Sequence, residues 1–139
     1  MSRDTSTGQV LEAMVLPALR LGGYTFHKQV DVGERPNGRR HIVDIVAEKN
    51  GVKFLISMKW QQTSGTAEQK VPFEVICLIK SIRESNGEYS RAYLVLGGPG
   101  WTLRDYYISG SLNEYLRYDE YVTITTLEDF IALSNRGHL

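Results

Sequence analysis

Hydrophobic and polar positions recur along the chain with two different periods, and each change of period predicts the boundary of a structural element. Between residues 7 and 21, apolar side chains return every three or four positions, which predicts an amphipathic helix that ends at Gly22-Gly23. Pro17 lies inside this pattern and removes one backbone hydrogen bond. We therefore expect a kink or a weakening of the helix at that point.

Three strands are predicted next. Residues 24–32 alternate apolar and polar side chains, which is the period of a half-buried strand. Residues 42–48 and 52–59 form two more apolar runs, and Asn50-Gly51 between them is a strong signal for a tight β-hairpin turn. Because the run 52–59 is apolar on both faces, it is expected to be a central strand. Together these runs predict a three-stranded meander.

Helices and strands alternate in the second half of the chain. A helix is predicted from about residue 71 to 85, preceded by a turn or bend at 66–70, because Pro72 is costly inside a helix. The remaining predicted elements are strands at 89–96 and 122–125 and helices at 111–116 and 127–134. This order predicts an α/β fold in which one mixed β-sheet is flanked by helices.

Composition narrows the class of protein. A chain of 139 residues fits a single domain, 1–139, with one core. Its 16 basic and 16 acidic residues cancel, so any binding of nucleic acid must depend on a local patch of charge. The lone Cys77 excludes a disulfide framework and a cysteine metal site. The chain shows neither a secretory apolar segment nor a membrane-spanning run, so we expect a soluble cytoplasmic protein.

Charged residues interrupt the two central apolar runs. Asp44 lies within the first run, Lys59 lies at the end of the second, and Glu12 lies beside the apolar stripe of the first helix. If the helix packs on the meander, these three side chains can converge. Carboxylates hold a hard divalent cation, and a cation or ammonium group steadies the charge that develops during phosphodiester hydrolysis. The set therefore predicts a nuclease site.

A basic loop precedes the Asp44 strand. Arg35, Arg39 and Arg40, together with His41, are expected to contact DNA phosphates beside this site. The alternative is that the loop is only a solvated turn.

Structural roles are open for the other candidate residues as well. Asp44 can form a buried ion pair with Lys59 or Lys28, and Lys59 can extend to solvent. Glu12 can be the solvated flank of an amphipathic helix. Glu68 can be an acid favoured by the helix dipole rather than a metal ligand.

Aromatic and glycine-rich segments follow the fourth predicted strand. Trp101, Tyr106 and Tyr107 can stack on bases, but burial in a subunit interface is favoured because apolar residues adjoin them. Residues 97–101, GGPGW, lack the lysine and hydroxyl residue of a phosphate-binding loop, which disfavours a hydrolase of small phosphate esters.

The order of these elements and residues resembles the PD-(D/E)XK nuclease superfamily. The resemblance rests on Glu12 in the first helix, Val43-Asp44 in the second strand, and Ser57-Met58-Lys59 in the third, followed by a helix and a strand. It covers about residues 6–97 and implies an α-β-β-β-α-β core like that of restriction endonucleases. Residues 98–139 would form an extension for oligomerisation or DNA contact.

The resemblance implies roles for individual residues. Asp44 would be the principal metal ligand, with the backbone oxygen of Met58 as a further ligand, while Lys59 would position or activate water and Glu12 would assist metal binding. Ser57 stands where the family has an acid, which leaves the site one negative charge short. The residues available to compensate are Gln61, Gln62 and Glu68. Val43 replaces the motif proline, which supplies no ligand.

These expectations define two alternative functions. The first is a DNA endonuclease that depends on Mg²⁺, with Mn²⁺ as a substitute, and hydrolyses phosphodiester bonds with metal-activated water. Because one domain offers one site, cutting both strands requires a homodimer or a higher homo-oligomer. The alternative is a weakened or inactive nuclease fold that serves as a DNA-binding or assembly module.

Overall fold

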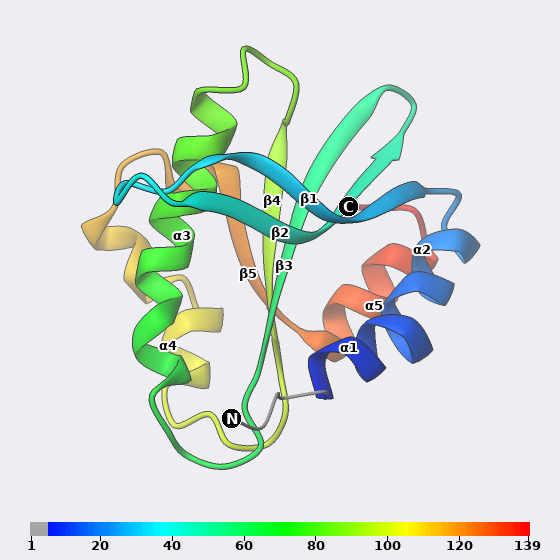
Figure 1. The fold of residues 1–139 in the computed structure, drawn as a ribbon. Helices are drawn as coiled ribbons and strands as arrows, with labels where there is room; N and C mark the ends of the chain where they lie inside the picture. The colour runs from blue at the N-terminus through cyan, green and yellow to red at the C-terminus, as the bar shows by residue number, and fades with distance from the viewer. Residues whose placement is uncertain (1–5) are drawn as a thin grey trace.

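The computed structural model describes residues 6–139 and contains one mixed five-stranded sheet with the strand order β1-β2-β3-β4-β5 (Figure 1). The strands are β1 (Thr25–Glu34), β2 (Arg40–Lys49), β3 (Val52–Trp60), β4 (Arg91–Gly97) and β5 (Val122–Thr126). β1, β2 and β3 are antiparallel neighbours, whereas β4 and β5 run parallel to β3. The structure therefore confirms the predicted mixed sheet and its central third strand.

Helices cover both faces of this sheet. The helical elements are α1 (Ser6–Val10), the π-helical turn η1 (Leu11–Val15), α2 (Leu16–Leu21), α3 (Ala67–Arg83), α4 (Arg104–Ile108), the 3-10 turns η2 (Ser111–Tyr115) and η3 (Asp119–Tyr121), and α5 (Leu127–Asn135). In Figure 1, α3 and α4 lie on one side of the sheet, and α1, α2 and α5 lie on the other. Each side has its own apolar core. Residues 98–139, expected as an extension, supply β5 to the sheet and residues to both cores.

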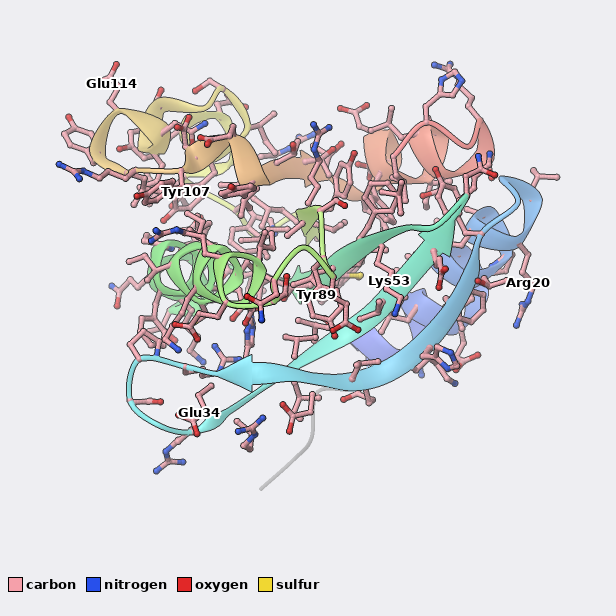
Figure 2. All side chains as sticks on the ribbon, turned by 90° about the horizontal axis from the view of Figure 1, so that it is seen from above. Arg20, Glu34, Lys53, Tyr89, Tyr107 and Glu114 are labelled. Atoms are coloured by element: carbon pink, nitrogen blue, oxygen red, sulfur yellow. The ribbon has the colours of Figure 1, made fainter. Side chains whose placement is uncertain are left out.

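The sheet divides between β2 and β3. β2 pairs with β3 from Ile45 to Lys49, and beyond Ile45 it stays paired with β1 alone. The rest of β3, from Ser57 to Trp60, pairs only with β4. The β1–β2 arm crosses toward α3, and its tip at Glu34 lies beside that helix in Figure 2. This division is called the fork below.

Side-chain alternation in β2 is interrupted at the fork. Val43 packs in the core beneath α3, but Ile45, two residues later, packs in the core of the opposite face. In a regular strand, two residues that are two positions apart lie on the same face of the sheet. The alternation of side chains between the two faces of β2 therefore shifts by one position at Asp44.

Pro17 leaves a visible mark on the first helix. The amide of Leu16 donates to the carbonyl of Leu11, five residues earlier, which is the spacing of a π-helix. Pro17 itself cannot donate to Ala13. The irregularity predicted at this proline is thus present as the π-helical turn just before it.

The predicted start of the third helix was wrong. α3 begins at Ala67 and continues through Pro72. Pro72 cannot donate to the carbonyl of Glu68, but the hydroxyl of Tyr107 donates to that oxygen at 2.7 Å. In Figure 2, Tyr107 reaches from α4 toward α3. A contact from a distant segment therefore offsets the backbone bond that the proline removes.

Among residues 6–139, none of the helices has the length and apolar character needed to cross a membrane.

We predict that Tyr107→Phe lowers the free energy of unfolding by about 1–2 kcal/mol, because it leaves the buried Glu68 carbonyl without a donor. Tyr106→Phe is the matched control, since Tyr106 is exposed and contacts the neighbouring ring edge to face. Urea denaturation measures both values.

Adding Pro72→Ala should reduce the cost of Tyr107→Phe, because the new amide can donate to Glu68. Equal costs in the two backgrounds would contradict this account of how α3 tolerates its proline.

Candidate active site at the fork

Asp44 lies at the fork, next to the last residue of β2 that pairs with β3. Its Oδ2 accepts a hydrogen bond from the amide of Met58 at 2.7 Å, in place of the backbone partner that β2 no longer provides. Its Oδ1 has no donor among residues 6–139. Asp44 therefore joins β2 to β3 with one oxygen and keeps the other available.

Lys59 and Ser57 lie on the α3 side of β3. Leu55 belongs to the core beneath α3, and positions 57 and 59 follow it at strand spacing. Within the described part of the chain, Lys59 forms no ion pair with a carboxylate. Lys28 pairs with Glu12 instead of Asp44. The structure therefore disfavours the interpretation of Asp44 as half of a structural ion pair.

Glu74 of α3 brings a second carboxylate to the same side of the sheet. Its side chain is 4% exposed. Oε1 accepts from Arg35 at 2.9 Å, and Oε2 lies 3.0 Å from Nε2 of the fully buried His41. Burial by itself would raise the pKa of Glu74, but the His41 bond, the Lys59 charge and the Arg35 bond outweigh it and lower this pKa to about 2. Glu74 is therefore a buried anion.

The surroundings shift the pKa values of the two acids in opposite directions. Burial raises the pKa of Asp44, the Met58 amide and the Lys59 charge oppose that rise, and the negative charge of Glu74 adds to it. Asp44 and Glu74 thus influence each other, and both feel Lys59. The negative charge on Asp44 is incompletely balanced by the protein, which is a condition that a bound cation would relieve.

The carboxylates do not form a complete metal site by themselves. No group of three or more His, Cys, Asp and Glu side chains suited to a metal ion occurs in residues 6–139. Two hard oxygen donors nevertheless suit Mg²⁺, which keeps several waters and is bound by one or two carboxylates together with substrate phosphates. The donor chemistry of Asp44 and Glu74 therefore fits that ion.

Sequence reasoning missed Glu74. Its signal was its position, because it follows Val71 by three residues and precedes Leu78 by four, and both of these are fully buried. An acid within the apolar stripe of a helix must have polar partners. Those partners, Arg35 and His41, come from a distant segment of the chain.

Glu12 lies elsewhere. It pairs with Lys28 of β1, and the two side chains are 60% and 50% exposed. The structure does not bring it into contact with Asp44 or Lys59, so its role in metal binding stays a prediction.

The basic loop also differs from the expectation. His41 is 0% exposed and cannot contact a phosphate in this structure, because it is bound between Ser81 and Glu74. Arg35 is engaged by Glu74 and Cys77. Arg40 is exposed but pairs with Asp31 and Glu34. Arg39 is exposed and, within residues 6–139, has no ion pair, so it is the best placed of the four for a phosphate.

Two of the three residues expected to compensate for Ser57 form hydrogen bonds with loop residues instead. The carboxylate of Glu68 accepts hydrogen bonds from Thr102 and from the Leu103 amide just before α4, and these bonds lower its pKa, the Thr102 hydroxyl most. Gln61 donates to the carbonyl of Gly100 at 2.7 Å. Gln62 is exposed.

Close packing explains the glycine-rich segment. A Cβ at Gly98 would lie 2.4 Å from the carbonyl oxygen of Gln61, and one at Gly100 would lie 2.5 Å from the backbone of Thr63. The glycines thus allow two loops to meet at the ends of β3 and β4. Trp101 and Tyr107 are buried in the core of the same chain, so their expected role at a subunit interface was wrong.

Comparison with known proteins identifies the family of the chain. Residues 3–138 match the sequence pattern of the PD-(D/E)XK nuclease superfamily domain. The chain belongs to this superfamily, as the resemblance implied. No curated protein sequence matches the chain.

Two solved structures are similar in fold. One is a protein of unknown function, with a TM-score of 0.48 and 16% identity over 81% of this chain and 54% of that one. Another is the small subunit of a heterodimeric restriction endonuclease, with a TM-score of 0.43 and 18% identity over 86% of this chain and 66% of that one. This chain thus spans between about half and two thirds of their length.

The opposite pKa shifts predict opposite effects on stability. Asp44→Asn keeps an acceptor for the Met58 amide and removes a buried charge, so at pH 7 the variant should be at least as stable as the wild type. Glu74→Gln should lose roughly 3 kcal/mol, because it leaves Arg35 without its anion. Urea denaturation at pH 7 distinguishes the two variants.

The low pKa of Glu74 also predicts how the free energy of unfolding depends on pH. The folded pKa of Glu74 lies below its ordinary value of 4.5, so its contribution is complete above about pH 4.5 and is lost as the pH falls toward 2. The stability difference between wild type and Glu74→Gln should shrink over that interval. A difference that is constant from pH 7 to pH 3 would contradict the assignment.

Proposed function

We propose that the protein is a Mg²⁺-dependent DNA endonuclease whose site consists of Asp44, Lys59 and Glu74. The observation that carries this proposal is the Asp44 carboxylate held at the fork by the Met58 amide, on which the charges of Lys59 and Glu74 act in opposite directions. Membership of a nuclease superfamily supports the reaction class. DNA as substrate, a homodimer for cutting both strands, and a cytoplasmic location belong to the same proposal.

Glu74 is proposed to take the place of the acid that Ser57 lacks. It reaches the site from α3, on the side of the sheet that Ser57 and Lys59 face. Its low pKa keeps it ionised at any physiological pH. The missing negative charge is therefore supplied by a neighbouring element of the fold.

Asp44 and Glu74 would hold the metal with carboxylate oxygens. The Met58 amide points toward Asp44, and a strand residue directs its amide and carbonyl to the same neighbour, which supports the Met58 carbonyl oxygen as a further ligand. When bound, Mg²⁺ supplies Lewis-acid stabilisation of the phosphoryl oxygens and activation of water. Lys59 offers a positive charge and hydrogen-bond donors to the phosphate.

We predict that Asp44→Asn, Lys59→Met and Glu74→Gln each lower the rate of Mg²⁺-dependent plasmid cleavage by about 100-fold or more, because several kcal/mol of charge stabilisation depend on them. Ser57→Ala is the control and should change the rate by no more than about twofold. Agarose gel assays of supercoiled DNA measure all four.

Full activity in Asp44→Asn and Lys59→Met would remove the proposal. Full activity in Glu74→Gln alone would remove only the substitution of Glu74 for the missing acid. Glu12→Ala, assayed beside them, tests the role predicted for Glu12, which its surface ion pair with Lys28 does not favour.

The second candidate function is a nuclease fold without catalysis that binds DNA or assembles complexes. The neutral Ser57 in the place of the motif acid favours it.

Calorimetric titration with Mn²⁺ separates these candidates. The nuclease should bind Mn²⁺, and Asp44→Asn should abolish the heat of binding because it removes the principal ligand charge. The inert module should show DNA binding that is indifferent to Mn²⁺, and no metal binding.

A further inference from the structure

A chain of buried polar groups stands behind Glu74. Oγ of Ser81 lies 2.9 Å from Nδ1 of His41, and Nε2 of His41 lies 3.0 Å from Oε2 of Glu74. The three residues are 3%, 0% and 3% exposed. Ser81 and Glu74 belong to α3, whereas His41 comes from β2, three residues before Asp44. These hydrogen-bonded side chains therefore link β2 and α3, the two elements that carry the proposed carboxylate ligands.

The hydrogen bonds define where the protons lie. Glu74 is ionised and can only accept, so Nε2 of His41 must carry a proton and donate it. In the neutral imidazole, Nδ1 is then an acceptor, and the Ser81 hydroxyl donates to it. Glu74 thus requires the form of His41 with a proton on Nε2, and the Ser81 hydroxyl, which can donate or accept, holds the ring at Nδ1.

Two donors hold Glu74 from different sides. His41 contacts Oε2, and Arg35 contacts Oε1 at 2.9 Å. One donor on each oxygen fixes the plane of the carboxylate, and each oxygen keeps a further lone pair. A long glutamate side chain would otherwise choose among several rotamers.

We propose that His41, oriented by Ser81, is a positioning residue that fixes the Glu74 carboxylate for metal binding. This inference rests on the proposed function, because it assigns a purpose to the partners of a proposed ligand. Donors behind a ligand orient it and raise its affinity for the metal. The alternative is that the same bonds only attach the β1–β2 arm to α3, in which case they stabilise the fold and nothing more.

Two buried helical serines make a matched test. Ser81 bonds to His41, whereas Ser134 of α5 donates to the Phe130 carbonyl, far along the chain from the fork residues. Ser81→Ala and Ser134→Ala should both lower the melting temperature. In titrations of the full chain with Mn²⁺, without DNA, Ser81→Ala should bind about tenfold more weakly or worse, and Ser134→Ala should bind as the wild type does.

A second pair of variants addresses His41 itself. His41→Gln keeps an amide donor near Glu74, whereas His41→Leu has none. Mn²⁺ should bind at least about tenfold more tightly to His41→Gln than to His41→Leu. A purely structural role would lower the stability of both and leave their metal affinities equal.

The outcomes distinguish this inference from the function on which it rests. If the wild type binds Mn²⁺ through Asp44 but Ser81→Ala matches Ser134→Ala, and the two His41 variants bind alike, His41 is not a positioning residue and the metal site stands. If the wild type binds no Mn²⁺, the proposed function falls and this inference falls with it.

Discussion

The hydrogen bond from the Met58 amide to the Asp44 carboxylate joins β2 to β3 at the point where the sheet divides. On one side of this bond β2 is paired with β3, and on the other β2 leaves with β1 toward α3. A backbone amide at such an edge needs an acceptor, and a carboxylate that provides one is held in a defined position. The same group feels the charge of Lys59 and keeps one oxygen available.

Charge balance around the fork accords with a proposed site that is distributed over three elements. Asp44 pays a desolvation penalty that the protein only partly relieves, which is a common property of functional carboxylates. Glu74 is kept ionised by His41 and Arg35 at its oxygens and by the charge of Lys59. Glu74 is thus held as an anion, whereas the charge of Asp44 is only partly relieved within the described chain.

The buried anion also determines the course of the β1–β2 arm. Arg35 and His41 were expected to face DNA, but burying Glu74 without donors would be costly, and these residues supply them. The arm is consequently attached to α3. Of the four residues expected to bind DNA, only Arg39 keeps a positive charge without an ion pair in the described residues. Lys59 is a second such charge.

Local sequence determined the strands, the Asn50-Gly51 hairpin, the mixed sheet and the family, because periodicity and turn chemistry act between near neighbours. It also predicted Asp44 and Lys59 as site residues, since a charged residue within a buried apolar run needs a polar partner. Only the tertiary structure decided the rest. The Tyr107 hydroxyl offsets the bond that Pro72 removes from α3, and Arg35 and His41 hold the buried Glu74 carboxylate. Such hydrogen-bond partners are distant along the chain and leave no periodic signal in it.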